Sequence, residues 1–298
     1  MVYSSVLDLQ MKILITGHRG FVGKYFVEKY KDHDITGVDI ANGIDVRDFF
    51  KTNRESYDLV IHLAAIVGGR ATIEGNPLSV ATDLAIDSDF FNWALITRPG
   101  RIVYFSSSAA YPTKFQGNED WVRLEESMID LDNISNPDLT YGWSKLTGEY
   151  LAKFVQEAGI PVHIFRPFSG YGTDQSLDYP FPSYIKRAVD RMDPFEIWGD
   201  GEQTRDFIHM SDVVDAVDEA IRQDIQGPVN LGWGRRTTFN ELAKIVTEIE
   251  GYSPEFKHLP AAPVGVLNRI ANPTKMLSFY TPKITLEEGI ERALKGIV

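Results

Sequence analysis

Tyr141 and Lys145 are the residues whose types and spacing most directly suggest chemistry. Residues four apart share one face of a helix, where an ammonium would favour the phenolate and lower the phenol pKa. Upstream lies a triple serine, Ser106 to Ser108, one of whose hydroxyls would orient a substrate oxygen. With a dinucleotide bound beside them, these side chains predict hydride transfer at a secondary alcohol or ketone.

A second pair, Tyr25 and Lys29, has the same spacing, so the spacing alone is not specific. We expect this second pair to serve only packing and the surface. The first pair is distinguished by what precedes it along the chain. A strand, a glycine turn, a helix, an acidic strand end and a serine-bearing strand all come before the helix of Tyr141.

A glycine-rich turn follows a short apolar run and precedes a helical pattern. Gly17 permits a tight turn, Gly20 lets the backbone approach a pyrophosphate, and Gly23 allows close packing of helix on sheet. The pyrophosphate would lie at the helix N-terminus. The turn residues predicted to contact the dinucleotide are Gly17, Arg19, Gly20, Phe21, Val22 and Gly23.

Asp39 ends the second predicted strand and indicates which dinucleotide binds. A carboxylate there accepts hydrogen bonds from a ribose 2′-hydroxyl and repels a 2′-phosphate, which favours NAD. Arg19 would instead suit a 2′-phosphate, so NADP remains an alternative. We give Asp39 the greater weight and predict NAD.

Further cofactor contacts are predicted in nearby loops and at strand ends. Asp45 and Val46 would lie near the adenine, unless Asp45 is an ordinary exposed loop residue. Small residues after the third strand would let the backbone approach the dinucleotide. The remaining assignments are Leu63, Ala64, Ala65, Ser106, Arg166 and Phe168, together with Tyr141 and Lys145.

The composition limits the class of function. The formal net charge is −12, which argues against a nucleic-acid-binding surface. There is no cysteine, so disulfides, zinc-thiolate sites and a cysteine nucleophile are excluded. The six histidines show no metal-ligand spacing, and we expect structural roles for them. We predict no metal site.

The chain shows no sign of a membrane segment or a secretion signal. No apolar run reaches the roughly 18 residues of a membrane span. Met1 to Gln10 lacks the basic start and apolar stretch of a signal peptide. We therefore expect a cytoplasmic protein with a short N-terminal extension, residues 1–10.

Apolar runs alternate with helical patterns along the first half of the chain. A polar stretch at 112–138 is predicted to form a long loop, and such loops are more often functional than idle. The alternation predicts an α/β fold, a Rossmann-type doubly wound parallel sheet. Strands are predicted at 12–16, 34–39, 58–63, 101–105 and 162–165, and helices at 21–30, 81–95 and 140–157.

The pattern changes after about residue 168, where prolines and glycines interrupt it. Helices at 183–192, 211–222 and 238–250 are joined by loops. We expect a dinucleotide-binding domain over 11–167, to which 201–230 returns, and a smaller mixed substrate lobe over 168–298. The lobe would close over the carboxyl ends of the strands, where open α/β sheets bind ligands.

Together these motifs resemble those of the extended short-chain dehydrogenase/reductases, specifically the NAD-dependent nucleotide-sugar epimerase/dehydratase family. The resemblance runs from Lys12 to about Val214 and rests on TGHRGFVG, HLAA, YFSSSAAYP, YGWSK, FRPFSGYG and WGDGEQTRDFIHMSDVV. It implies that Tyr141 is the acid/base, that Lys145 binds the nicotinamide ribose and tunes the tyrosine, and that a serine holds the sugar oxygen. Ser107 and Ser108 are both candidates for this serine, and Ser107 is preferred.

The resemblance also implies a nucleotide-diphosphate sugar as substrate. Arg205 would bind the diphosphate with its planar fork, the alternative being a surface arginine paired with Asp206. Ser169 stands where the family commonly has an asparagine. The predicted substrate contacts are Ser107, Ser169, Tyr179 and Arg205, with Phe181, Trp198 and Arg269 as weaker candidates that ordinary lobe packing explains equally well.

Two departures from the family pattern narrow the chemistry. Sugar dehydratases carry an acidic residue where this chain has Ala109, and Ala110 follows it. GDP-fucose synthases and GDP-mannose 3,5-epimerases use a cysteine there or next to it. Abstraction of a carbon-bound proton needs a positioned base, and the sequence offers none. TGHRGFVG and the segment Ala65 to Gly69 nevertheless look most like the GDP-fucose synthase branch.

The simplest reaction that these residues support is C4 epimerisation of an NDP-hexose through a transient 4-keto intermediate. An NAD(P)H-dependent reductase of a 4-keto NDP-sugar would use the same residues in one direction. A non-catalytic dinucleotide-binding protein is a third hypothesis, disfavoured because Tyr141 and Lys145 are both intact. The family also implies a homodimer built on the helices at 81–95 and 140–157.

Overall fold

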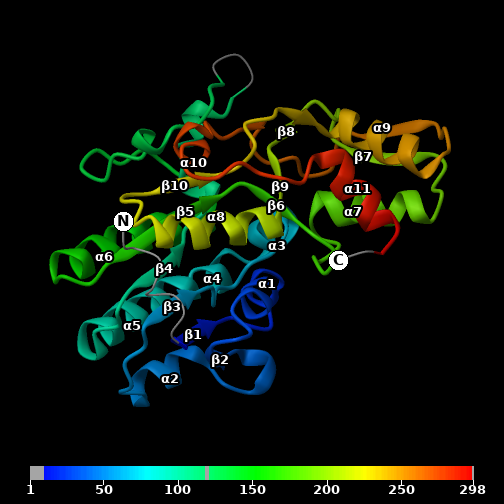
Figure 1. Ribbon diagram of the computed structural model, residues 1–298. Helices are drawn as coiled ribbons and strands as arrows, with labels where there is room; N and C mark the ends of the chain where they lie inside the picture. Colours follow the sequence, from blue (N-terminus) through cyan, green and yellow to red (C-terminus); the bar gives the residue numbers. More distant parts are fainter. Residues whose placement is uncertain (1–9, 118–120, 297–298) are drawn as a thin grey trace.

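The computed structural model describes residues 10–117 and 121–296 (Figure 1), so the predicted extension lies almost wholly outside the described residues. Six strands form the main sheet in the order β10-β5-β4-β3-β1-β2, and every neighbouring pair is parallel. The predicted parallel sheet is confirmed. Its strands are β1 (Lys12–Thr16), β2 (Asp34–Val38), β3 (Leu59–His62), β4 (Ile102–Phe105), β5 (Val162–Pro167) and β10 (Val229–Leu231).

Helices cover both faces of this sheet (Figure 1). On one face lie α1 (Phe21–Lys29) and α8 (Met210–Arg222), and on the other α2 (Val46–Thr52), α5 (Thr82–Thr97) and α6 (Leu139–Glu157). Strand β1 serves both cores, because Ile13 and Ile15 pack in the first cluster and Leu14 packs in the second. Strands buried on both faces read as continuous apolar runs. The five strands of this sheet that the sequence predicted lie within two residues of their predicted bounds, whereas the three-residue β10 was not predicted.

Short helices, which the sequence analysis did not predict, connect the main elements. The segment after β3 forms α3 (Arg70–Gly75) and α4 (Pro77–Val80). Short 3-10 helices follow β2 and β4, and two more lie within the predicted loop at 112–138. They are η1 (Ile40–Asn42), η2 (Ser108–Ala110), η3 (Thr113–Phe115) and η4 (Glu126–Met128). This loop packs on the protein, since Leu124 is fully buried and forms a β-bridge with Ala271.

A smaller lobe holds most of the chain after β5. Its core joins three helices, α7 (Pro180–Val189), α9 (Phe239–Glu250) and α11 (Leu286–Leu294). Helix α7 begins three residues before the predicted start, because proline is well tolerated in the first turn. Helix α8 and strand β10 belong instead to the main sheet layer. The remaining elements are β6 (Ser169–Tyr171), β7 (Phe195–Trp198), β8 (Thr204–Arg205), β9 (Phe207–His209), β11 (Thr237–Thr238), β12 (Phe256–Leu259), β13 (Asn268–Arg269) and α10 (Thr274–Leu277).

Helix α6 lies close to strand β4 and helix α5 at Gly148. A Cβ atom at this glycine would overlap the Tyr104 hydroxyl and lie 2.7 Å from Oδ2 of Asp87. The Tyr104 hydroxyl donates a hydrogen bond of 2.5 Å to that same carboxylate. Glycine is therefore required here by close packing, and the packing sets the position of the helix that carries Tyr141 and Lys145.

We expect Gly148→Ala to lower the free energy of unfolding by about 1–3 kcal/mol, because the added methyl group overpacks this junction. The matched control is Gly75→Ala, also in a helix, where a Cβ atom meets nothing within 4 Å. Urea denaturation of both variants checks the prediction. Equal stability of the two would contradict it.

Candidate active site

The carboxyl ends of the parallel strands bring the predicted site residues to one edge of the main sheet. The glycine turn follows β1, Asp39 follows β2, and the segment 63–65 follows β3. The triple serine follows β4, and Phe168 follows β5. Strand order reverses beside β1, which lies between β2 and β3. Such an edge is where open α/β sheets bind ligands.

The glycine turn packs tightly against the end of β3. Gly17 has a φ of +70°, and a Cβ atom there would lie 3.0 Å from backbone atoms of Leu63 and Ala64. A Cβ atom at Gly23 would overlap the Gly17 carbonyl oxygen. The Thr16 hydroxyl fastens the two segments, since it accepts hydrogen bonds from the backbone N–H groups of Leu63 (3.1 Å) and Ala64 (3.2 Å).

The start of α1 fits the pyrophosphate of a dinucleotide. Gly20 is the N-cap, no side chain caps the helix, and the first turn carries no acidic residue. The N-terminal N–H groups and the positive end of the helix dipole therefore favour an anion at this position. Arg19, beside the cap, is exposed.

Asp39 lies beside this turn, where a ribose contact was predicted. Its Oδ2 accepts the backbone N–H of Arg19 at 2.9 Å, and its Oδ1 accepts that of Ala41 at 2.8 Å. An ionised carboxylate has about four lone-pair sites, so it can accept further hydrogen bonds. Asp39 therefore holds the glycine turn and keeps the capacity to bind a ribose hydroxyl.

Asp45 and Val46 have structural roles of their own. Asp45 is the N-cap of α2, accepting the Arg47 backbone N–H at 2.9 Å, and forms a 2.6 Å ion pair with the Arg47 side chain. This partnership holds the pKa of Asp45 below its usual value. Val46 is buried in the core between the sheet and α5. Asp45 is thus a helix cap rather than an ordinary loop residue.

Tyr141, Lys145 and Ser107 lie together. The Ser107 side chain lies near enough to the Tyr141 phenol to act on its pKa, and the Lys145 ammonium lies 5.8 Å from the centre of the tyrosine ring. Burial and the charge of Asp83 raise the pKa of Tyr141, although Ser107 acts in the opposite direction. The lowered pKa expected from Tyr141 and Lys145 alone is therefore wrong. Desolvation outweighs the neighbouring groups that favour the phenolate.

The three serines have different surroundings. Ser107 caps η2, accepting the backbone N–H of Ala109 at 3.1 Å, and lies beside Tyr141. Ser108 is buried within η2 itself. The Ser106 hydroxyl donates to Glu149 on α6. Ser107 is therefore the serine that the structure brings to the phenol.

Two carboxylates that the sequence analysis missed lie behind this group, on helix α5. Asp83 and Asp87 are each 1% exposed. Asp83 accepts the backbone N–H of Ile66 at 2.6 Å, and Asp87 lies 3.2 Å from Nε2 of His62. Their spacing was a usable signal, because residues 83 and 87 share a helix face with apolar Ile86 and therefore point inward.

His62 has the structural role expected of it. Its ring stacks on Phe90 with centroids 3.9 Å apart, and its Nδ1 lies 2.8 Å from the Thr16 hydroxyl. Burial lowers the pKa of His62, although Asp87 opposes this effect. The second Tyr/Lys pair serves packing and surface ion pairs, since Tyr25 packs edge-on to Phe21 and His209 and Lys29 pairs with acidic residues of α8.

The structure gives Arg166 a different role from the predicted cofactor contact. Its guanidinium is 1% exposed and forms a bidentate ion pair with Glu149, at 2.9 and 2.7 Å. It also donates to the Tyr111 hydroxyl and to the carbonyl oxygen of Glu126. These partners make Arg166 an internal brace rather than the predicted cofactor contact. Phe168 likewise packs beside Tyr111.

Three arginines gather around one carboxylate where the lobe meets the sheet. Asp138 accepts hydrogen bonds from Arg70 (2.8 and 3.0 Å) and from Arg269 (2.7 Å). Although burial opposes it, Arg269 and Arg70 hold the pKa of Asp138 below its usual value. Burial and the neighbouring Arg269 lower the pKa of Arg205 to about 9. The cluster has more positive than negative groups, which suits a multiply charged anion.

The alternative role of Arg205, an ion pair with Asp206, is wrong. Arg205 donates to backbone carbonyl oxygens of Thr204 (2.7 Å), Val266 (2.9 Å) and Val264 (3.2 Å). Asp206 is fully buried and instead accepts the backbone N–H groups of residues 233, 234 and 271. Arg70 was not predicted, because a single arginine after a glycine pair carries no motif.

The other predicted substrate contacts are divided between the site and the lobe core. Tyr179 is the N-cap of α7, and burial together with the nearby Tyr141 phenol raises its pKa. Ser169 lies in β6, and its backbone N–H donates to the Asp206 carbonyl oxygen. Phe181 is buried in the lobe core, so ordinary packing accounts for it.

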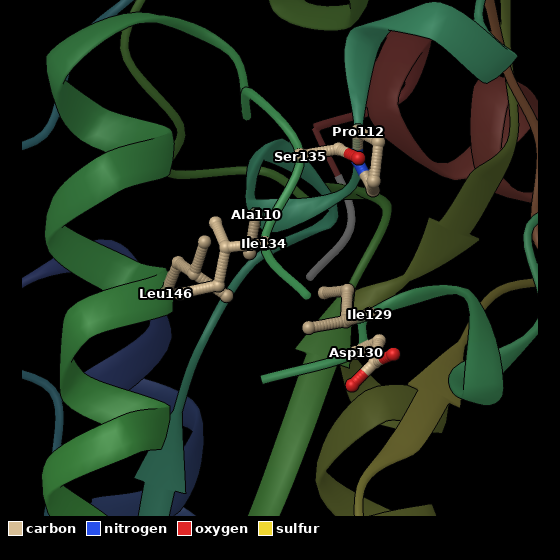
Figure 2. A pocket seen from close by; sticks show the side chains of 7 residues that line it. All are labelled: Ala110, Pro112, Ile129, Asp130, Ile134, Ser135 and Leu146. Carbon is tan, nitrogen blue, oxygen red and sulfur yellow. The ribbon is translucent and has the colours of Figure 1, made fainter. Parts of the chain in front are cut away.

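A small pocket lies between α6 and the predicted loop, with Ala110 and Leu146 facing Ile134 (Figure 2). Its volume is about 10 Å³, room for one water molecule at most. It cannot hold a nucleotide or a sugar. Within residues 10–117 and 121–296, no cluster of three or more acidic, histidine or cysteine side chains could hold a metal ion. In the same residues, no helix combines the length and apolar character needed to cross a bilayer.

Comparison with known proteins identifies the family. Residues 13–232 match the model of the NAD dependent epimerase/dehydratase family. GDP-L-colitose synthase of Yersinia pseudotuberculosis is 25% identical over 305 residues, covering 95% of this chain and 96% of that protein. A dTDP-4-dehydro-6-deoxy-D-allose reductase of Streptomyces bikiniensis is 29% identical over 298 residues, covering 89% of each.

Solved structures agree on the fold. The UDP-glucose 4-epimerase of Thermus thermophilus, solved in complex with NAD, superposes with a TM-score of 0.81 at 22% identity. The match covers 96% of this chain and 98% of that one. With the family model spanning the sheet, the glycine turn and the Ser/Tyr/Lys group, this chain belongs to the NAD dependent epimerase/dehydratase family of enzymes.

Proposed function

We propose that this protein is an NAD-dependent nucleotide-sugar epimerase that inverts C4 of an NDP-hexose through a transient 4-keto intermediate. The observation that carries the proposal is the Ser107–Tyr141–Lys145 group flanked by buried Ala109 and Ala110. A tyrosine can take a proton from a hydroxyl. Positions 109 and 110, where relatives carry an acidic residue or a cysteine, are alanines here and supply no base for abstracting a proton from carbon.

The cofactor assignment rests on the fit of the glycine turn. The open N-terminus of α1 would hold the pyrophosphate, and Asp39 would accept a ribose hydroxyl. NAD held there would supply the hydride chemistry at C4, as acceptor in the oxidation and as donor in the return to the opposite face of the sugar. Lys145 is buried beside Tyr141, where it would bind the nicotinamide ribose and stabilise negative charge on the phenol.

Tyr141 and Ser107 would handle the proton at O4. The Ser107 hydroxyl orients the sugar hydroxyl, and Tyr141 takes its proton as the keto group forms and returns it as the hydride comes back. Because the pKa of Tyr141 is raised, its deprotonation depends on positive charge beside it, which Lys145 provides. The cycle is balanced, since both the proton and the hydride are restored to the substrate.

The arginine cluster is the proposed diphosphate site. Arg205 and Arg269 lie opposite each other on the neighbouring strands β8 and β13. Arg269 donates to the Asp138 carboxylate, and Arg70 donates to the same carboxylate from the sheet side. Guanidinium groups bind phosphate oxygens bidentately. The sugar would then extend from this cluster toward Tyr179 and Tyr141.

A one-way reductase of a 4-keto NDP-sugar is the second candidate. It is favoured by one relative, which is named as a reductase of a dTDP-4-dehydro sugar. Tyr141 would then donate a proton to the keto oxygen in each turnover and be reprotonated from solvent. The two candidates differ in whether the reduced cofactor is consumed.

The test combines cofactor analysis with product analysis. We expect the purified protein to release stoichiometric NAD on denaturation and to interconvert UDP-glucose, UDP-GlcNAc or a GDP-hexose with its C4 epimer. Mass spectrometry and anion-exchange chromatography measure the two quantities. An empty site that prefers NADPH, together with NADPH-dependent reduction of a 4-keto sugar, would establish the reductase instead. No turnover on a broad NDP-sugar panel would rule out the epimerase.

We expect Tyr141→Phe to lower kcat about 10³-fold, since it removes the group that transfers the proton. Tyr25→Phe is the matched control from the second Tyr/Lys pair. The Tyr25 hydroxyl has no hydrogen-bond partner in the structure, so its loss should leave kcat unchanged. Steady-state kinetics on both variants checks the prediction, and an active Tyr141→Phe enzyme would contradict the mechanism.

We also propose a homodimer built on α5 and α6. Trp143, Tyr150 and Phe154 lie along one side of α6 and are 42%, 42% and 46% exposed. A second copy of the chain would cover this apolar stripe. Phe154→Glu should give a monomer by light scattering, whereas Lys153→Ala, at the exposed neighbouring position, should not. A wild-type monomer would refute the proposal.

A further inference from the structure

Asp138 is a buried carboxylate bound by two arginines of the proposed diphosphate site. Its side chain is 9% exposed, and it accepts hydrogen bonds from Arg70 at 2.8 and 3.0 Å and from Arg269 at 2.7 Å. The planar fork of a guanidinium binds carboxylate and phosphate oxygens in the same way. Asp138 therefore occupies N–H groups that a diphosphate would use.

The charges of the cluster favour competition between Asp138 and a diphosphate. Arg70, Arg205 and Arg269 are balanced in part by Asp138 and by Glu74, the second acidic partner of Arg70. A diphosphate would add further negative charge to the same guanidinium groups. If Asp138 stayed in place, two anions would share these donors at close range, where like charges repel strongly. We therefore expect a diphosphate to displace the carboxylate.

Asp138 is also the N-cap of α6, the helix that carries Tyr141. Aspartate is a preferred N-cap residue, because its carboxylate accepts the backbone N–H of the second or third helical residue. In α6 these residues are Thr140 and Tyr141. Among the described residues, no side chain makes this capping bond. The arginines thus hold the Asp138 carboxylate away from the bond that its position in the helix favours.

The start of α6 carries a strained residue next to Asp138. Leu139, the first helical residue, has a φ of +54°, a left-handed conformation that leucine rarely adopts. Such strain persists only where the surrounding contacts enforce it. Asp138 is held at both its carboxylate and its backbone, whose N–H donates to the Ala109 carbonyl oxygen at 2.9 Å. Release of the carboxylate would let Leu139 take a helical φ and let Asp138 cap the helix.

We propose that Asp138 is an autoinhibitory counter-ion and a positioning residue. The substrate diphosphate displaces its carboxylate from Arg70 and Arg269, and the released carboxylate caps α6 at the backbone of Tyr141. The inference rests on the proposed function, which assigns the diphosphate to these arginines. Occupation of the diphosphate site is thereby transmitted to the acid/base residue. Asp138 itself contacts neither the reacting carbon nor the transferred proton.

The variant Asp138→Asn tests the displacement. Asparagine keeps an oxygen that can cap the helix but removes the charge that competes for the arginines. UDP and GDP are the probes, and the one that the wild type binds more tightly is used throughout. We expect its dissociation constant, measured by titration calorimetry, to be about tenfold lower for Asp138→Asn than for the wild type. Asp132→Asn is the matched control, with the same charge change at an exposed position of the same loop, and should bind like the wild type.

The variant Asp138→Ala separates release from capping, because alanine can neither compete for the arginines nor cap the helix. Hydrogen exchange of the first turn of α6, followed by mass spectrometry, reports the cap. In the wild type, we expect the nucleotide to slow this exchange about fivefold. In Asp138→Asn the exchange should be slow even before the nucleotide is added. In Asp138→Ala it should stay fast with and without the nucleotide, although the nucleotide binds more tightly than to the wild type.

The inference is overturned if Asp138→Asn binds the nucleotide no more tightly than the wild type does. It is also overturned if the nucleotide slows exchange equally in the wild type and in Asp138→Ala. A wild type that binds neither UDP nor GDP would refute it together with the proposed diphosphate site. A wild type that binds the nucleotide but inverts no NDP-hexose would refute only the C4 assignment, since neither measurement depends on turnover.

Discussion

The buried ion pair between Arg166 and Glu149 is the interaction on which the active site depends. Glu149 is on α6, the helix that also carries Tyr141 and Lys145, and Arg166 is on β5. The Ser106 hydroxyl, at the end of β4, donates to the same glutamate. Buried charges are stable only with well-oriented partners, so the helix cannot slide or rotate relative to the serines without breaking these bonds. The pair therefore fixes the distance between Ser107 and Tyr141.

The polar groups around α6 form two layers, one that stabilises the fold and one that serves the chemistry. The first layer, with Arg166, Glu149 and Ser106, is fully paired and behaves as part of the core. The second layer, with buried Asp83 and Lys145 and half-buried Tyr141, is incompletely paired, since one oxygen of Asp83 has no hydrogen-bond partner. Unpaired buried groups are rare in folded proteins and are often found at functional sites. The contrast between these adjacent layers separates the scaffold from the site that it supports.

The sequence predicted five strands of the main sheet because most of them are buried on both faces and leave a simple apolar signature, and it missed the short strand β10. It also located the glycine turn, Asp39 and the Tyr/Lys helix, whose spacing follows directly from local geometry. It misjudged Arg166 because a strand-end arginine can serve a ligand or an internal glutamate, and the choice depends on a partner 17 residues away. It missed Asp83 and Arg70 because each acquires its role only when distant segments meet. The pKa of Tyr141 was misjudged for the same reason, since burial is a property of the folded chain.

The order in which the chain builds the main sheet links its two parts. Strand β10 and helix α8 complete the sheet, yet they follow β6 and α7 of the lobe along the chain. A fragment ending at Pro167 would therefore leave β5 as a bare edge and remove α8, which shares the cover of one face with α1. Sheet and lobe are interleaved rather than consecutive, so neither can be gained, lost or exchanged as a contiguous module. Recombination in this family would have to respect that boundary, and variation in the lobe is more easily achieved by substitution than by replacement of a domain.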